Sequence, residues 1–259
     1  MSTSHTAETL SIEGPDATAF AQSQFSSNLA ALPPGRWQFS AWLDAQGRVR
    51  NLFHLARLDQ QHLLLLLRGG KAQAMADALQ RYVFRSRVRL TPATGRLGCA
   101  AALPLFETDR DGAGIRLGCD DHSLEINTAS GDDAWCLPQL RRGWAWLPDA
   151  AMDALLPPAL SLYRLQAIAL DKGCYPGQEI VARLHYRGGH KRHLHRVLLA
   201  PAAGDATPAL DDTQAVHWLQ RAAHDGQVET LVVMPDSLAD RLTRLPGDAR
   251  PRIVESWPD

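Results

Sequence analysis

The sequence lacks most features that mark common functional classes. Its 259 residues include only four cysteines, and no two of these have the C-x-x-C spacing of a zinc or redox pair. No G-x-S-x-G, P-loop or G-x-G-x-x-G motif is present, which disfavours α/β-hydrolase, P-loop and Rossmann chemistry. The formal net charge of -1 argues against a nucleic-acid binder that is basic over its whole surface.

Targeting and membrane signals are equally scarce. The first twenty residues show no basic segment followed by an apolar stretch, and the longest apolar run, Leu63–Leu67, is too short to cross a bilayer. We therefore expect a cytoplasmic protein with reduced thiols and no membrane partner. Hydrophobic residues make up 45% and charged residues 21%, which is typical of a packed globular chain.

Hydrophobic periodicity indicates an α+β protein. In the first part we expect a strand, a helix, a three-stranded meander, a second helix and another strand, over residues 8–14, 15–32, 37–68, 71–84 and 85–90. Weak short strands follow up to residue 140, and two helical pieces separated by Pro157 and Pro158 come after them. Short strands at 193–200, 214–224, 226–234 and 251–257 predict a small β-barrel or sandwich.

The stretch "DKGCYPGQEIVARLHYRGGHKRHLHR", residues 171–196, stands apart from this scaffold. Pro176 and Gly177 predict a turn, and Gln178 begins a predicted helix. Cys174 would then precede a helix N-terminus, whose free N–H groups stabilise a thiolate, with Lys172 as a further positive charge. The alternative is a small buried cysteine that fills a tight turn.

The residues after the thiol also allow two interpretations. Gln178 and Glu179 either bind a polar ligand or cap the helix. The five cations after Glu179 form either a solvated face or a site for phosphates or carboxylates: Arg183, Arg187, Lys191, Arg192 and Arg196. His193 and His195 share one face of a predicted strand, but no acid or cysteine lies nearby in the sequence, so we predict no metal site. For the other three cysteines we expect structural packing.

The run "KGCYPGQE", residues 172–179, matches the K-G-C-[aromatic]-x-G-Q-E signature, and the chain resembles the YgfZ family. Family-like segments also occur in order at 14–32, 43–57, 79–90 and 179–192. The resemblance implies a fold like that of the T-protein of the glycine cleavage system, with two α+β subdomains and a C-terminal β-barrel around a central opening. The implied first subdomain, which resembles a folate-binding one, comprises residues 1–88 and 140–190. The second, shortened subdomain comprises residues 89–139, and the β-barrel comprises residues 191–259.

The resemblance also implies a function. It is that of a folate-binding accessory protein that supports iron–sulfur enzymes, such as tRNA methylthiolases, and tRNA modification. Cys174 and Lys172 would form the functional thiol site, and the cofactor would be tetrahydrofolate. The implied contacts of that cofactor are Trp135, Asn51, Tyr175, Gln178, Glu179, Arg183 and Arg187.

Three residues bear on this expectation. Asn51 replaces the carboxylate that assists one-carbon transfer in T-protein, and an amide cannot act as a general base, which disfavours the alternative function of aminomethyl transfer. Arg141 stands where the family usually has a pterin-binding Glu, which weakens the expectation of folate binding. Trp135 either stacks on a flat ring or packs in the core.

A third hypothesis is direct RNA binding through residues 183–196. The sequence shows no basic excess elsewhere and no exposed aromatic residues interleaved with the cations, so we expect no direct nucleic-acid contact.

Overall fold

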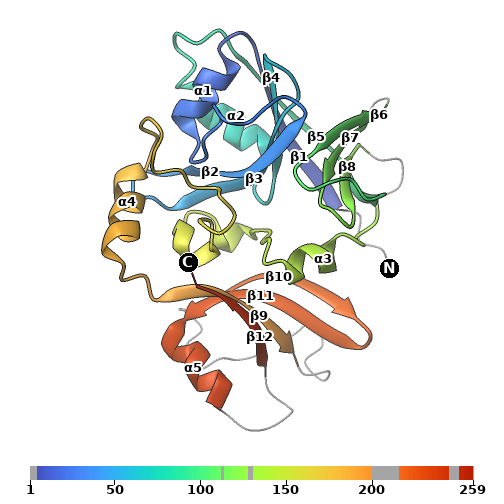
Figure 1. Ribbon diagram of the computed structural model, residues 1–259, viewed down its shortest axis with the longest axis vertical. Coiled ribbons are helices and arrows are strands. Elements are labelled where there is room, and N and C mark those ends of the chain that lie inside the picture. The colour runs from blue at the N-terminus through green and yellow to red at the C-terminus, as the bar shows by residue number, and fades with distance from the viewer. Residues whose placement is uncertain (1–4, 112–113, 128–130, 200–215, 245–250, 259) are drawn as a thin grey trace.

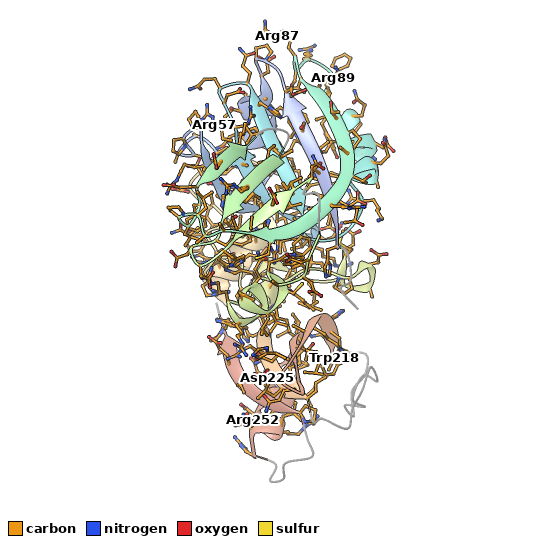
Figure 2. The ribbon with its side chains drawn as sticks, turned by 90° about the vertical axis from the view of Figure 1, so that its right-hand side faces the viewer. Arg57, Arg87, Arg89, Trp218, Asp225 and Arg252 are labelled. Atoms are coloured by element: carbon orange, nitrogen blue, oxygen red, sulfur yellow. The ribbon has the colours of Figure 1, made fainter. Side chains whose placement is uncertain are left out.

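The computed structural model describes residues 5–111, 114–127, 131–199, 216–244 and 251–258. In Figure 1 the large sheet and two helices form the upper part of the molecule, the smaller sheet and one helix form the lower part, and the helical connection lies between them. Turned by a right angle, the molecule is elongated, with Arg87 and Arg89 at one end and Asp225 and Arg252 near the other (Figure 2). No helix in the described part is long and apolar enough to cross a membrane.

The large sheet has eight strands in the order β2-β3-β4-β1-β5-β8-β7-β6, and all its pairs are antiparallel. Its strands are β1 His5–Glu13, β2 Arg36–Leu43, β3 Val49–Arg57, β4 His62–Leu67, β5 Arg89–Ala100, β6 Thr108–Asp111, β7 Gly114–Gly118 and β8 Ser123–Ile126. The predicted meander at 37–68 is confirmed as β2, β3 and β4.

The sheet curls until its two ends meet. Arg36 in β2 forms an isolated bridge with Glu107, and the Trp37 N–H donates to the Phe106 carbonyl, just before β6. Strand β5 pairs with β1 along its first part and with β8 along its last four residues. The expected subdomains 1–88 and 89–139 thus share one continuous sheet through β5.

Helices α1 (Ala17–Gln24) and α2 (Ala72–Gln80) pack against this sheet around Phe20, Phe25 and Leu79. The predicted helix 15–32 is too long, because the residues after Gln24 form hydrogen bonds with distant parts of the chain and leave the helix. The hydroxyl of Ser26 accepts from the Ala41 N–H at 3.0 Å and donates to the Ala167 carbonyl at 2.7 Å. These bonds replace the helical ones that this part of the chain gives up.

The connection between the sheets contains α3 (Cys136–Arg141), the 3-10 turns η1 (Asp149–Ala151) and η2 (Pro157–Leu160), and α4 (Gln178–Arg187). The two helical pieces predicted around Pro157 and Pro158 are wrong, since these prolines begin η2 instead of separating helices. Proline has no N–H and suits the first turn of a helix. Burial of Leu155, Ala159 and Leu160 then decides the path of this segment.

The C-terminal part forms a four-stranded antiparallel sheet in the order β10-β11-β9-β12. Its elements are β9 Arg192–Leu199, β10 His217–His224, β11 Gln227–Pro235, α5 Asp236–Arg244 and β12 Arg252–Trp257. All four strands were predicted, whereas α5, which packs Leu238 and Ala239 on the sheet, was not. The described residues do not confirm a closed β-barrel.

Candidate functional site

The thiol loop is fixed by a close contact with the turn between β2 and β3. Gly177 has φ +77°, and a Cβ added there would lie 2.5 Å from the Asp44 carbonyl oxygen and 2.8 Å from the Gly47 Cα. Only glycine accepts both this backbone conformation and this contact. Helix α4 begins at Gln178, as predicted, so residues 172–176 form a loop held at a helix N-terminus.

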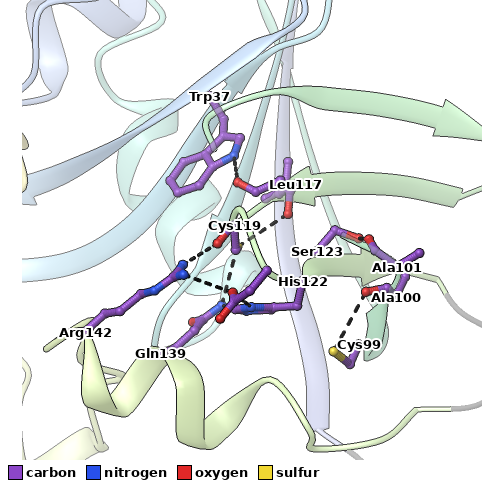
Figure 3. A network of polar contacts seen from close by, with 12 residues as sticks. Trp37, Cys99, Ala100, Ala101, Leu117, Cys119, His122, Ser123, Gln139 and Arg142 are labelled. Carbon is purple, nitrogen blue, oxygen red and sulfur yellow. Dashed lines mark hydrogen bonds and ion pairs between the residues drawn. The ribbon is translucent and has the colours of Figure 1, made fainter. Parts of the chain in front are cut away.

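Cys174 is the exposed member of the four cysteines, all of which are free thiols. Burial raises the pKa of Cys119 and of Cys136 to about 12, and Cys99 is half-buried. Figure 3 shows Cys119 inside a polar network, where its thiol donates to the Leu117 carbonyl at 3.5 Å and accepts from Gln139 at 3.8 Å. This environment is that of a packing residue, whereas Cys174 is accessible to a reaction partner.

Lys172 is tied to the segment that follows α1. Its ammonium donates to the carbonyl oxygens of Phe25, at 2.5 Å, and Ser27, at 2.9 Å, and it lies 5.0 Å from the centre of the Tyr175 ring. Burial lowers the pKa of Lys172 to about 8. The amine therefore anchors the loop and has a neutral fraction close to neutral pH.

Two other predicted contacts belong to the inner side of the loop. Tyr175 is buried, its hydroxyl has no hydrogen-bond partner among the described residues, and burial raises its pKa. The amide of Gln178 donates to the Lys172 carbonyl at 3.4 Å, which closes the loop. We interpret both side chains as supports of the loop conformation.

Glu179, Arg183 and Arg187 come together on the outer face of α4. With Ala182 and Tyr186 they line a hollow of about 460 Å³. All three charged residues are exposed, so they are accessible to a ligand. Of the predicted cofactor contacts, these three lie on a surface hollow.

Asn51 and Trp135 lie inside the protein. Asn51 in β3 is buried, and a Cβ added at Gly70 would lie 2.9 Å from its side-chain nitrogen. Trp135 is only 1% exposed, donates to the Asp132 carbonyl, and has the rings of His5 and Trp146 each centred 4.9 Å away. Of the two interpretations of Trp135, its burial favours core packing.

Sequence analysis did not identify Arg68, whose charged side chain lies in the interior beside the Trp146 ring. Arg68 is fully buried and donates to the side-chain oxygen Oε1 of Gln139 at 2.8 Å and to the backbone carbonyl of Ala145 at 2.9 Å. Its guanidinium carbon lies 4.6 Å from the centre of the Trp146 ring, and burial lowers its pKa to about 9. As packed, the residues around Trp135 do not fit a pterin stacked on that indole.

Arg141 points to the C-terminal sheet. It donates to Glu229 in β11 through Nε at 2.9 Å and through Nη2 at 2.5 Å. The donor that was expected to face a pterin is therefore bound by a carboxylate from another part of the chain.

The histidines of β9 have separate partners. His193 contacts Asp236 at 2.6 Å, and His195 contacts Ser256 at 2.8 Å. Among the residues described, no group of three or more His, Cys, Asp or Glu side chains is arranged to hold a metal ion.

Comparisons with known proteins agree with this architecture. Residues 2–102 match the family model described as GCVT N-terminal domain. The tRNA-modifying protein YgfZ of Edwardsiella ictaluri is 27% identical, over 95% of this chain and 88% of the relative, and that of Escherichia coli is 26% identical, over 95% and 89%. The chain is similar to YgfZ proteins along nearly its whole length.

Two further matches concern an uncharacterized relative and a solved structure. An uncharacterized protein of Haemophilus influenzae is 29% identical over 71% of this chain and 68% of its own length. Among solved structures, aminomethyltransferase T of the glycine cleavage system from Bartonella henselae matches with a TM-score of 0.63 and 14% identity, over 89% of this chain and 76% of that one. At that identity the match shows the fold alone, which is T-like with a large curled sheet.

Proposed function

We propose that this YgfZ-like chain is an accessory protein of tRNA modification that supports iron–sulfur enzymes through the thiol of Cys174. The observation that carries the proposal is the exposure of Cys174 on the "KGCYPGQE" loop, while the other three cysteines are buried or half-buried. Relatives at about 26% identity that cover nearly the whole chain are named tRNA-modifying proteins.

The loop supplies what a reactive or cluster-binding thiol needs. Gly177 and the buried Tyr175 fix the backbone on either side of Pro176, and the helix that follows directs its first N–H groups toward the loop. Lys172 holds the loop against the segment after α1 and keeps a positive charge beside it below about pH 8. In this proposal the thiolate acts as a nucleophile or as a ligand to a cluster intermediate.

Complementation tests this function. In a strain from which this protein or its bacterial relative has been deleted, the wild-type chain should restore methylthiolation of tRNA, and Cys174→Ser should not. Cys99→Ser is the matched control and should restore it. Full restoration by a stably expressed Cys174→Ser variant would contradict the proposal.

Tetrahydrofolate binding stays a prediction, which the GCVT family match and the T-like fold support. The packing of Trp135 against Trp146 and Arg68 disfavours a pterin at that indole, and Asn51 offers no base for aminomethyl transfer. Titration of tryptophan fluorescence with tetrahydrofolate tests the ligand. A saturable quench that is lost in Trp135→Phe would place the pterin there after all.

A further inference from the structure

The outer face of α4 and the turn after it carry an exposed aromatic ring that the sequence analysis did not expect among the cations of 183–196. Tyr186 is 76% exposed, an unusual position for a large aromatic side chain. It lies one helical turn beyond Arg183 and next to Arg187, so all three residues border the same hollow. We call the surface made by Arg183, Tyr186, Arg187, Gly189 and Lys191 the α4 track.

The cations of the α4 track are available to a ligand. Within the described ranges, Arg183, Arg187 and Lys191 form no ion pair with an acidic residue. Gly188 and Gly189 both have positive φ, and a Cβ added at either would meet nothing within 4 Å. The backbone at this turn is therefore open to close approach by a ligand.

Three hollows border the α4 track. The first, of about 630 Å³, lies between β2, the segment 165–171 and α4, and it reaches His185 and Tyr186. The second, of about 460 Å³, is the hollow on the outer face of α4 that Arg183, Tyr186 and Arg187 help to line, and the third, of about 320 Å³, is lined by residues within 154–159 and 189–192. Tyr186 borders the first two, so one extended ligand can reach both hollows across its ring.

We propose that the α4 track binds single-stranded RNA. Exposed aromatic rings stack on bases whatever their identity, and arginines beside them hold the phosphates. The two acidic residues that border the hollows, Asp171 in the first and Glu179 in the second, match the amino groups of bases. An acidic peptide would use the cations but would leave the ring of Tyr186 without a stacking partner.

This inference rests on the proposed function, for which it names RNA as the bound partner. It also overturns the expectation that no exposed aromatic residue lies among the cations of 183–196. Asp171 lines the first hollow and directly precedes Lys172 in the chain. An RNA strand bound along the α4 track and in this hollow would therefore have one end beside the thiol loop.

Fluorescence anisotropy with the full chain and a labelled, unpaired 12-nucleotide RNA of A and C tests the proposal. Tyr186→Ala should weaken binding about 5- to 100-fold, while Tyr186→Phe keeps most of it. Arg183→Ala and Arg187→Ala should each reduce the slope of log affinity against log salt by about 0.7. Cys174→Ser should bind RNA like the wild type, so this test is separate from complementation.

Phe84 provides the matched control. It is 87% exposed on the loop between α2 and β5, with the Arg85 guanidinium 5.7 Å from its ring centre. Phe84→Ala should leave RNA affinity unchanged. Wild-type affinity in Tyr186→Ala, or a loss in Phe84→Ala instead, would overturn the inference. So would an absence of RNA binding together with tight binding of tetrahydrofolate pentaglutamate that depends on Arg187.

Discussion

Arg141 at the end of α3 is paired with Glu229 in strand β11 of the C-terminal sheet. Nε and Nη2 of Arg141 both donate to Oε1 of Glu229, and Nη1 of Arg196 donates to Oε2 at 2.8 Å. Glu229 is only 4% exposed, whereas the side chain of Arg141 is about half-exposed. The carboxylate is therefore fully paired inside the protein, and it fixes the end of α3 on β11.

Loss of this carboxylate should destabilise the protein more than loss of one arginine. Glu229→Gln leaves two facing guanidinium groups and should lower the free energy of unfolding by about 3 kcal/mol. Arg141→Gln should cost about 1 kcal/mol, because Arg196 still pairs the carboxylate. Urea unfolding of both variants measures the difference, and equal costs would contradict this account.

Acid should act through the same carboxylate. Burial alone would raise the pKa of Glu229, but the hydrogen bonds from Arg141 and Arg196 outweigh burial and hold it below 4.5. A lowered carboxyl pKa adds stability that is complete above the unfolded value and is lost as pH falls through the folded one. The gap in unfolding free energy between wild type and Glu229→Gln should therefore close below pH 4.5.

Lys172 should make stability depend on alkaline pH. Its pKa is about 8 in the folded chain against 10.5 in the free side chain, so the unfolded state holds more protons between these values. The unfolding free energy of the wild type should therefore rise from pH 8 to pH 10, by about 1–2 kcal/mol relative to Lys172→Met. If the unfolding free energies of the two proteins depended on pH in the same way, the Lys172 amine would not be buried.

Cys174 should be the fast thiol of the native protein. Titration with an aromatic disulfide at pH 8 should release about one equivalent quickly and the remainder only after denaturation, because Cys119 and Cys136 are buried and have a pKa of about 12. Cys174→Ser should remove the fast phase, and Cys99→Ser should retain it. Two fast equivalents in the wild type would argue against a single accessible site.

Gly177→Ala should destabilise the protein more than Gly173→Ala, a substitution in the same loop. Gly177→Ala adds a Cβ 2.5 Å from the Asp44 carbonyl oxygen at positive φ, and should lower unfolding free energy by about 1–3 kcal/mol. Gly173→Ala meets nothing within 4 Å and should change it by less than about 0.5 kcal/mol. Thermal unfolding compares the two, and similar midpoints would exclude the close contact.

The strands were predictable because their signals are local. Short apolar runs between turn residues predicted β2, β3 and β4, and the Pro176–Gly177 turn predicted where α4 begins. Helix α1 was overestimated because its continuation depends on Ser26, whose hydroxyl binds Ala41 and Ala167 far along the chain. A hydrogen bond between residues so far apart in the chain leaves no pattern in the local sequence.

The sequence by itself determined the YgfZ-like signature, the α+β class and the loop that carries Cys174, since each depends on residues close together in the chain. Only the tertiary structure decided which aromatic rings face water. Trp135 is packed against Trp146 and Tyr186 is exposed, although Trp135 directly precedes α3 and Tyr186 lies in the last turn of α4. Burial depends on which distant segments cover a side chain, and that is a property of the folded chain.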